Sequence, residues 1–306
     1  MKPDRIGLLG FYTNQPRNSQ ADYEEAADLF RQVGESWEQL TAMGISTTAY
    51  AMDAQFDRAQ QIFVDVKELA SELGSKMHLA WAHCFAPFYR YLIGQIDARE
   101  AGEEIEFAIP FAVECNDFGA EILARGHLCA IAVRERDPDE AARLAKITHA
   151  TLWRNKGRLP ARTPQIALVY TGEAALYALQ ENHVDKQRLQ QIVTRSARRA
   201  IKLGKNFPYI LGPAMRLKAS YTAYSRGKSA AGRQFNQTLR VLEQGSDRWQ
   251  TGVGYYEAAY WLTEDRAEHI AKAQSIFEHN SLPVELARLE RLQRERLPEQ
   301  NQKGAN

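Results

Sequence analysis

Cysteine is scarce in this 306-residue sequence, and its three cysteines, Cys84, Cys115 and Cys129, are odd in number and lie within apolar helical patterns. A disulfide framework needs paired cysteines and an oxidising compartment, so these residues favour free thiols in a reducing one. No apolar run approaches the roughly 18 residues that span a bilayer. The apolar stretch 6–11 is at the lower limit for a signal peptide, and no small-residue cleavage site follows it. We therefore expect a cytoplasmic protein with no membrane partner.

The sequence also lacks an excess of charge of either sign and a complete phosphate-binding motif. Its formal net charge of +1 gives no reason to expect a globally basic or acidic partner. Residues 227–229 read Gly-Lys-Ser, as at the end of a phosphate-binding loop, but Thr222 occupies the position of the required earlier glycine. We interpret this segment as a turn that ends a helix. Gly252 and Gly254 likewise predict a turn before Tyr255.

No pattern typical of a metal site or a catalytic triad is present. The histidines include no pair at positions i and i+4 with a glutamate between them. His83 is adjacent to Cys84, and His127 is two residues from Cys129, so neither pair shares a helix face. We therefore expect no metal, no cofactor and no catalytic residue. An enzyme whose site is dispersed along the chain stays as an alternative, because triads form in space.

A repeated helical signature is the main positive feature. Apolar residues of the segment 56–73 recur at steps of three and four, which predicts one amphipathic helix. Within it, Ala59 precedes Phe63 by four residues. The same small-to-aromatic spacing occurs at Ala26–Phe30, Ala231–Phe235 and Ala273–Phe277, with weaker copies at Ala101–Ile105 and Ala141–Ala145.

The alanines of successive copies are separated by 33, 42 and 40 residues, then by 90, and again by 42. The interval of 90 predicts a degenerate copy near Arg188–Ile192. Such periods indicate stacked repeats, in which a small residue lets two helices approach closely and the aromatic residue fills the space between neighbours. A second apolar helix is predicted before several copies, at residues 77–93, 118–133, 166–179, 207–224 and 253–262. Pro87 and Pro213 fall inside two of these helices and predict a kink or a delayed start.

These residues resemble tetratricopeptide repeats. Besides the alanine-to-phenylalanine signature, the segment 37–40 reads Trp-x-x-Leu ahead of Ala59, and Leu73-Gly74 follows it. The longer period of about 42, the phrase Lys-Glu-Leu-Ala-Ser-Glu-Leu-Gly at 67–74 and the tail 273–289 are similar to one subgroup. That subgroup is the C-terminal helical-repeat region of large bacterial ATP-dependent regulators of the maltose-activator type, and of related multidomain cyclases and kinases.

The resemblance implies an all-α fold, a right-handed superhelix of stacked antiparallel helix pairs, or α-solenoid. We expect an N-terminal extension at 1–19, a tetratricopeptide-like domain of about six to seven helix pairs at 20–292, and a disordered polar tail at 293–306. Proteins of this subgroup carry their catalytic and DNA-binding domains elsewhere. The resemblance therefore implies a non-catalytic protein-binding, scaffold or sensing module in a signalling or transcriptional-regulatory system.

Charge is distributed unevenly along the chain. Residues 20–75 contain 11 acidic and 3 basic residues, whereas residues 150–206 contain 11 basic and 3 acidic residues. Arg188, Arg195, Arg199 and Lys202 fall on one helical face, and we call them the basic stripe. The stripe is either a solvated outer face or a docking surface for an acidic protein segment, which could belong to another copy of the chain. Nucleic acid is the less favoured partner, because the basic stretch lacks interleaved aromatic residues.

The second candidate surface is an inner groove formed by the first helices of the pairs. Tyrosine and arginine are enriched at protein interfaces, and nine tyrosines fall mainly on these helices. The groove candidates are Tyr89, Arg90, Arg134, Tyr177, Arg216, Tyr224 and Tyr256. Our leading hypothesis is that they capture a protein or peptide segment, or a small effector. Each tyrosine could instead be packing between helices.

Overall fold

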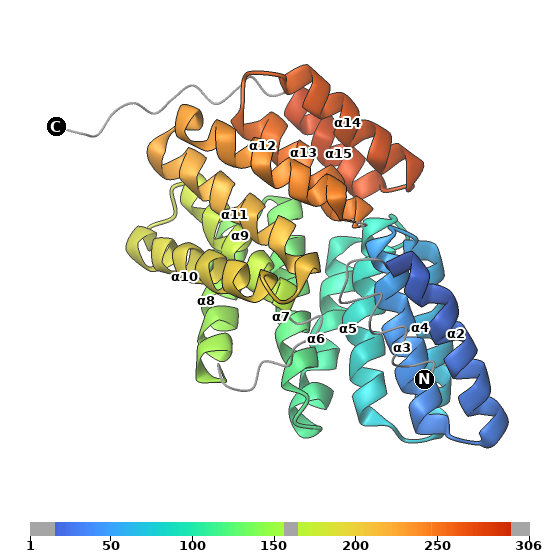
Figure 1. The fold of residues 1–306 in the computed structure, drawn as a ribbon. Coiled ribbons are helices and arrows are strands. Elements are labelled where there is room, and N and C mark those ends of the chain that lie inside the picture. Colours follow the sequence, from blue (N-terminus) through green and yellow to red (C-terminus); the bar gives the residue numbers. More distant parts are fainter. Residues whose placement is uncertain (1–15, 156–164, 246, 295–306) are drawn as a thin grey trace.

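The computed structural model describes residues 16–155, 165–245 and 247–294, and every regular element longer than one residue within them is an α-helix (Figure 1). The helices are α2 (Pro16–Val33), α3 (Ser36–Met52), α4 (Phe56–Glu72), α5 (Lys76–Leu92), α6 (Ala98–Glu114), α7 (Phe118–Glu135), α8 (Pro138–Arg154), α9 (Ile166–Gln180), α10 (Lys186–Gly204), α11 (Pro208–Arg226), α12 (Lys228–Gln244), α13 (Arg248–Trp261), α14 (Arg266–His279) and α15 (Pro283–Arg294). Each packs against the helix that follows it. The predicted all-α array is confirmed.

The ends of the array differ slightly from the expected boundaries. Helix α2 begins at Pro16, inside the segment 1–19 that we expected to be an extension. Helix α15 continues to Arg294, two residues into the expected tail. The rest of both segments, 1–15 and 295–306, lies outside the described residues. No helix in the described part of the chain has the length and apolar character that a bilayer crossing requires.

The small-to-aromatic signature lies on the even-numbered helices, and its residues are buried. In α4, Ala59 and Phe63 are both 0% exposed. Their counterparts in α12 and α14 are buried to the same extent, and Phe30 of α2 is half-buried. Close packing at the alanine and space filling one turn later explain why the chain repeats these types. Six pairs therefore run from α3/α4 to α13/α14, flanked by α2 and α15.

The degenerate copy lies on α10, one residue later than predicted. Leu189 and Val193 are 0% exposed and stand where the other copies have their small residue and the residue one turn later. Arg188 is exposed, although Ile192 is buried as expected. The predicted position was one residue too early because this repeat has no alanine to mark it.

Several helices begin at an aspartate that caps them. The side chains of Asp97, Asp117, Asp137 and Asp247 each accept a hydrogen bond from the backbone N–H three residues later. This satisfies a donor that the first turn of a helix leaves unpaired. The caps therefore fix where α6, α7, α8 and α13 begin.

The expected turn at Gly252 and Gly254 is wrong, because both residues lie inside α13. They are small because α13 is pressed against its neighbours. A Cβ atom at Gly252 would lie 2.5 Å from the ring of Phe277 on α14, and one at Gly254 would collide with Leu242 on α12. Gly227, in contrast, does end a helix, with a φ of 89° between α11 and α12. Glycine therefore has two different roles here: it ends a helix at Gly227, and it allows close helix packing at Gly252 and Gly254.

The odd-numbered helices α5, α7, α9, α11 and α13 correspond to the predicted first helices. They contact one another in sequence order along the inner side of the array. Pro87 and Pro213 are buried inside α5 and α11, and neither delays the start of its helix. Burial of these rings offsets part of the cost of the lost backbone hydrogen bond.

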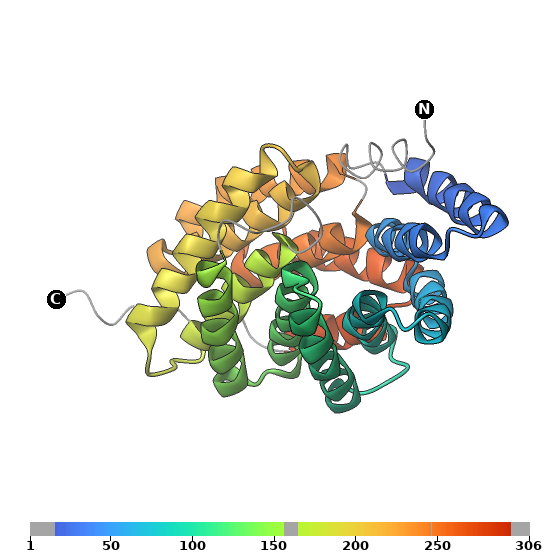
Figure 2. The ribbon, with the colours of Figure 1, turned by 90° about the horizontal axis from the view of Figure 1, so that it is seen from below.

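The array curves until its last helices meet its first ones. Helix α13 contacts α3, and α15 contacts α5. In Figure 2 the red C-terminal helices lie beside the blue and cyan helices of the N-terminal half. Trp249 packs edge-on against Phe56, with ring centroids 5.6 Å apart, and Arg248 pairs with Asp53 at 3.3 Å. The inner face is therefore divided into cavities by helices that belong to opposite ends of the chain.

Candidate functional site

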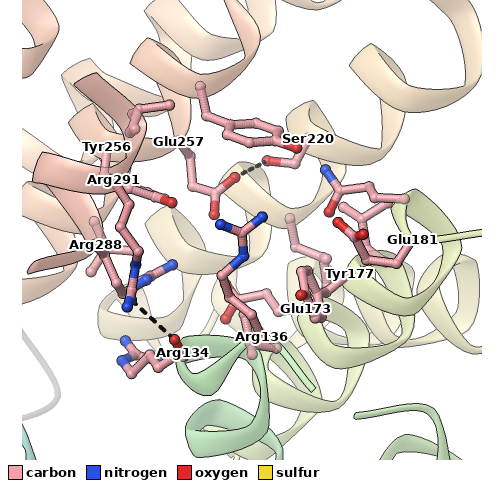
Figure 3. A pocket seen from close by; sticks show the side chains of 17 residues that line it. Arg134, Arg136, Glu173, Tyr177, Glu181, Ser220, Tyr256, Glu257, Arg288 and Arg291 are labelled. Atoms are coloured by element: carbon pink, nitrogen blue, oxygen red, sulfur yellow. Dashed lines mark hydrogen bonds between the residues drawn. The ribbon is translucent and has the colours of Figure 1, made fainter. Parts of the chain in front are cut away.

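A half-open cavity of about 100 Å³ lies on the inner side of the array, between α7, α9, α11, α13 and α15 (Figure 3). One water needs roughly 10–15 Å³ of such space, so the cavity has room for several waters or for one polar end of a ligand. We call it the inner cavity. Its lining consists of Val133, Arg134, Arg136, Glu173, Leu176, Tyr177, Gln180, Glu181, Leu217, Ser220, Val253, Tyr256, Glu257, Tyr260, Arg288, Arg291 and Leu292. Only the closed array brings these residues together.

One wall of the inner cavity is held by four buried side chains that join α7 to α13 and α15. Arg134 donates to the Glu285 carboxylate through Nη2 at 2.6 Å and through Nε at 3.1 Å. Arg288 donates to the other oxygen of Glu285 at 2.5 Å. The Trp249 indole N–H donates to Glu285 at 3.0 Å, and the Arg134 guanidinium lies 5.4 Å from the Trp249 ring. We call these four residues the clasp.

The two guanidinium groups of the clasp share one carboxylate, that of Glu285. Burial acts to raise the pKa of Glu285, but Arg134, Arg288 and the Trp249 N–H outweigh burial and lower this pKa to about 2. Burial acts to lower the pKa of Arg288, and Glu285 reverses this and raises it. Glu285 is 0% exposed, so its charge is available only to these partners. The clasp thus fixes the positions of two cavity-lining guanidinium groups.

The opposite side of the inner cavity carries carboxylates. Glu173 on α9 pairs with Arg216 at 2.5 Å, and Arg216 itself is 1% exposed. Glu257 on α13 accepts a hydrogen bond from the Ser220 hydroxyl at 3.1 Å and forms no ion pair with any described residue. Burial raises the pKa of Glu257, an effect that Arg216 and Arg288 oppose and Glu173 reinforces. Glu257 is therefore a half-buried lining carboxylate that lies within the field of two arginines but forms no direct ion pair with a described residue.

Charged residues also surround the mouth. Arg136, Glu181 and Arg291 are exposed at the ends of α7, α9 and α15. Arg291 donates to the backbone carbonyl of Arg134 at 3.2 Å. Figure 3 shows Arg288 and Arg291 on one side of the cavity and Glu181 on the other, with Glu257 between them. Arg136 also lies between the two sides in this view, so both signs of charge line the same cavity.

Three of the seven groove candidates meet at the inner cavity. Arg134 belongs to the clasp, Tyr177 is half-buried in the lining, and the ring of Tyr256 lies 4.4 Å from the Arg288 guanidinium. A fourth candidate, Arg216, supports the lining residue Glu173 from behind.

The other three candidates lie elsewhere. Tyr89 is 4% exposed among aromatic side chains of the core. Arg90 pairs with Glu104 at 2.8 Å between α5 and α6. The hydroxyl of Tyr224 donates to the backbone carbonyl of Leu179 at 3.4 Å. These three are not brought to the inner cavity.

Sequence reasoning missed the charged residues that complete the inner cavity. Glu257 and Arg288 carry no motif, and their repeats were recognised only by their apolar residues. A usable signal existed at one place, since Glu285 and Arg288 are charged residues three apart on a helix that buries both. Charges on the buried face of a repeat helix indicate a partner elsewhere in the fold.

The basic stripe forms a separate surface on α10. Arg188, Arg195 and Lys202 are exposed and form no ion pair with the described residues, and Arg199 is half-buried. The guanidinium groups of Arg195 and Arg199 lie 5.9 Å and 5.5 Å from the ring of Trp153 on α8. The fold therefore adds an aromatic ring to this surface, because Trp153 comes from the preceding helix pair.

Potential metal ligands and reactive thiols do not form a site in residues 16–155, 165–245 and 247–294, where no group of three or more His, Cys, Asp or Glu could hold a metal ion. Cys84 and Cys129 are buried free thiols, and burial raises the pKa of both. The Nδ1–H of His127 donates to the carbonyl of Cys84 at 2.9 Å, so this histidine is part of the core. The fully buried thiols are thus kept protonated.

A scan against protein-family models found no match, and a search of the curated proteins found no relative of this chain.

Proposed function

We propose that the chain is a binding module that takes the charged end of a peptide segment into the inner cavity. The observation that carries this proposal is the convergence of both signs of charge, together with Tyr177 and Tyr256, on one half-open cavity. The resemblance to tetratricopeptide repeats also supports it, since such arrays bind partners on their inner side. The event would then be passed to a signalling or transcriptional partner.

The arrangement of charges favours a ligand that carries both signs. Glu257 forms no direct ion pair with a described residue, so an ammonium group would give it one. Arg291 donates only to a backbone carbonyl in the described structure and leaves guanidinium donors for a carboxylate. A peptide terminus or an acidic and a basic side chain of one segment would satisfy both walls.

Binding at this position would be coupled to the closure of the array. The cavity is lined by α7 and α9 and by α13 and α15, and the clasp joins α7 to α13 and α15. A ligand that bridges the two sides binds the closed arrangement more tightly than an open one, so it shifts the population toward closure. This is how occupancy would be transmitted to the outer surface.

A thermal-shift screen of free amino acids and short peptides tests the proposal. Ligands of the expected class raise the Tm of the wild-type protein in a saturable way, because they bind only the folded state. The shift is reduced in Glu257→Gln and retained in Glu264→Gln, a matched control at an exposed position of the loop after α13. A screen in which no zwitterionic ligand shifts the Tm, or in which both variants respond as the wild type does, contradicts the proposal. Turnover of a hit would support the alternative of a dispersed enzyme site.

A second candidate function is docking of an acidic protein segment on the basic stripe. The specific observation is that Arg188, Arg195 and Lys202 are exposed without ion-pair partners in the described structure, beside Trp153. Guanidinium groups and an indole ring together are typical of interface hot spots. The acidic segment 20–75 of another copy is one source of such a partner.

Charge reversal tests this second function. Arg195→Glu with Arg199→Glu should abolish binding of an acidic peptide, whereas Arg233→Glu with Arg240→Glu on the exposed face of α12 should leave it unchanged. Binding should weaken steeply with salt. Equal binding by both double variants excludes docking on the stripe. If single-stranded nucleic acid binds more tightly than the peptide, the partner is a nucleic acid and not a protein segment.

A further inference from the structure

A second cavity, of about 70 Å³, lies at the junction between the two ends of the array, and we call it the aromatic cavity. Its lining draws on α3, α4, α5, α7, α9, α11 and α13 and includes Phe56, Phe85, Phe88, Tyr170, Tyr209 and Trp249. It does not share a lining residue with the inner cavity. At roughly 10–15 Å³ for each water, the aromatic cavity has room for roughly five waters or one small organic group.

The aromatic rings of this cavity form one contacting cluster. The ring centroids of Phe88 and Trp249 are 5.9 Å apart, and those of Phe56 and Tyr89 are 5.2 Å apart. Tyr170 lies 6.4 Å from Trp249. Because Phe56, Phe88 and Tyr170 come from three helices of the earlier part of the chain, the cluster and its cavity exist only in the closed array.

One polar atom without a partner among the described residues is buried in the wall of this cavity, the side-chain oxygen of Gln250. Tyr89 is 4% and Tyr170 is 3% exposed, and neither hydroxyl forms a hydrogen bond with the described residues. Burial raises the pKa of both phenols, so they stay neutral. Buried polar atoms in folded proteins nearly always have a partner. The Gln250 oxygen is an acceptor, so it favours an electropositive group in the cavity.

Asp247 is the one acidic side chain among the described residues that line the cavity. Asp247 lines it with its carboxylate, one oxygen of which accepts the backbone N–H of Gln250 at 2.9 Å. His127 also lines the cavity, but burial lowers its pKa to about 4, so it is neutral at physiological pH. Burial raises the pKa of Asp247 to about 7, and Arg216, which is already paired with Glu173, opposes this shift from a distance. The polarity of the site is therefore that of one carboxylate surrounded by aromatic rings.

We propose that the aromatic cavity binds a small substituted-ammonium cation, with the Asp247 carboxylate as its counter-charge. Aromatic rings attract such cations through their negative faces, and an alkylated ammonium is cheaper to remove from water than a bare one. An anion is disfavoured by Asp247, and a strongly hydrated metal ion would find one carboxylate where it needs several oxygen ligands. The cation can be free or can be the alkylated amine of a partner side chain.

The probe for this site is tetramethylammonium, and its neutral counterpart of similar shape is tert-butanol. In titrations followed by calorimetry and by Tm, tetramethylammonium binds saturably and tert-butanol binds at least tenfold more weakly, since only the cation gains from the ring faces and from Asp247. Glu257→Gln leaves this binding unchanged, which separates the aromatic cavity from the inner cavity and from the function proposed for it.

Two variants locate the binding. Asp247→Asn keeps a side-chain oxygen for the helix cap and removes the charge, so it weakens tetramethylammonium binding roughly tenfold or more without unfolding the protein. Ala51→Leu fills the cavity from α3 and abolishes binding, whereas Ala271→Leu at an exposed position of α14 does not. If Asp247→Asn fails to fold, the Ala51→Leu variant alone tests whether tetramethylammonium binds in the aromatic cavity. Equal affinity for both probes, no binding of either, or binding that survives Ala51→Leu overturns the proposal.

Discussion

Arg134 and Glu285 stand 151 positions apart in the sequence and form a buried ion pair with an N–O distance of 2.6 Å. The pair joins the third helix pair of the array to its last helix. The repeat period could not predict this ion pair, because a repeat pattern specifies contacts between neighbouring helices only. The clasp that surrounds this pair is what turns a curved array into one with inner cavities.

The first prediction concerns the clasp itself. Glu285→Gln leaves Arg134 and Arg288 buried without a counter-charge, so it should lower the free energy of unfolding by about 3–5 kcal/mol. Urea denaturation measures this loss. Glu290→Gln, on the exposed side of the same helix, should change it by less than about 0.5 kcal/mol. Equal stability of the two variants would mean that the clasp does not hold the array closed.

The second prediction concerns acid unfolding. Burial lowers the pKa of His127 from 6.5 to about 4, so the unfolded chain binds a proton more tightly than the folded one does. Stability from this residue is complete above about pH 6.5 and is lost as the pH falls toward 4. Between pH 7.5 and 4.5 the loss should be about 2–3 kcal/mol.

The test of this pH dependence is the variant His127→Asn, which keeps a donor for the Cys84 carbonyl and cannot titrate. It should be less stable than the wild type at pH 7.5 but lose less stability on acidification. His279→Asn, at an exposed position, should follow the wild-type profile. If His127→Asn and the wild type lose the same free energy between the two pH values, His127 is not the group responsible.

The third prediction separates two glycines that look alike in the sequence. Gly252→Ala should destabilise the protein by about 1–3 kcal/mol, because its Cβ would lie 2.5 Å from the Phe277 ring. Gly232→Ala, in α12, meets no atom within 4 Å and should be neutral or stabilise by up to about 1 kcal/mol through helix propensity. Thermal unfolding of both variants gives the comparison, and a stabilising Gly252→Ala would show that α13 and α14 are farther apart than described.

These two glycines also show what the sequence could and could not predict. The spacing of Ala59 and Phe63 predicted the even-numbered helices, because small and aromatic residues at one-turn spacing have a direct packing meaning. Gly252 was misread as a turn because its cause is a neighbouring helix and not the local backbone. In α10, Leu189 replaced the expected alanine and moved the register by one residue.

The candidate site was predictable only in part. Tyrosine and arginine on the first helices pointed to Arg134, Tyr177 and Tyr256, and the structure brings these three residues to one cavity. Glu257 could not be found in this way, because nothing in its own repeat distinguishes it from an exposed glutamate. Its significance depends on α11 and α15, which the closure of the array brings to it.

The most direct test of the proposed binding function is a titration of one peptide hit in three forms: free, N-acetylated and C-amidated. With the wild-type protein, acetylation and amidation should each weaken binding, because Glu257 and Arg291 respectively lose a charged partner. With Glu257→Gln the effect of acetylation should disappear while that of amidation remains, and with Arg291→Gln the reverse should hold. If both modifications weaken binding equally in the wild type and in both variants, the peptide does not place its termini in the inner cavity and the proposed function is wrong.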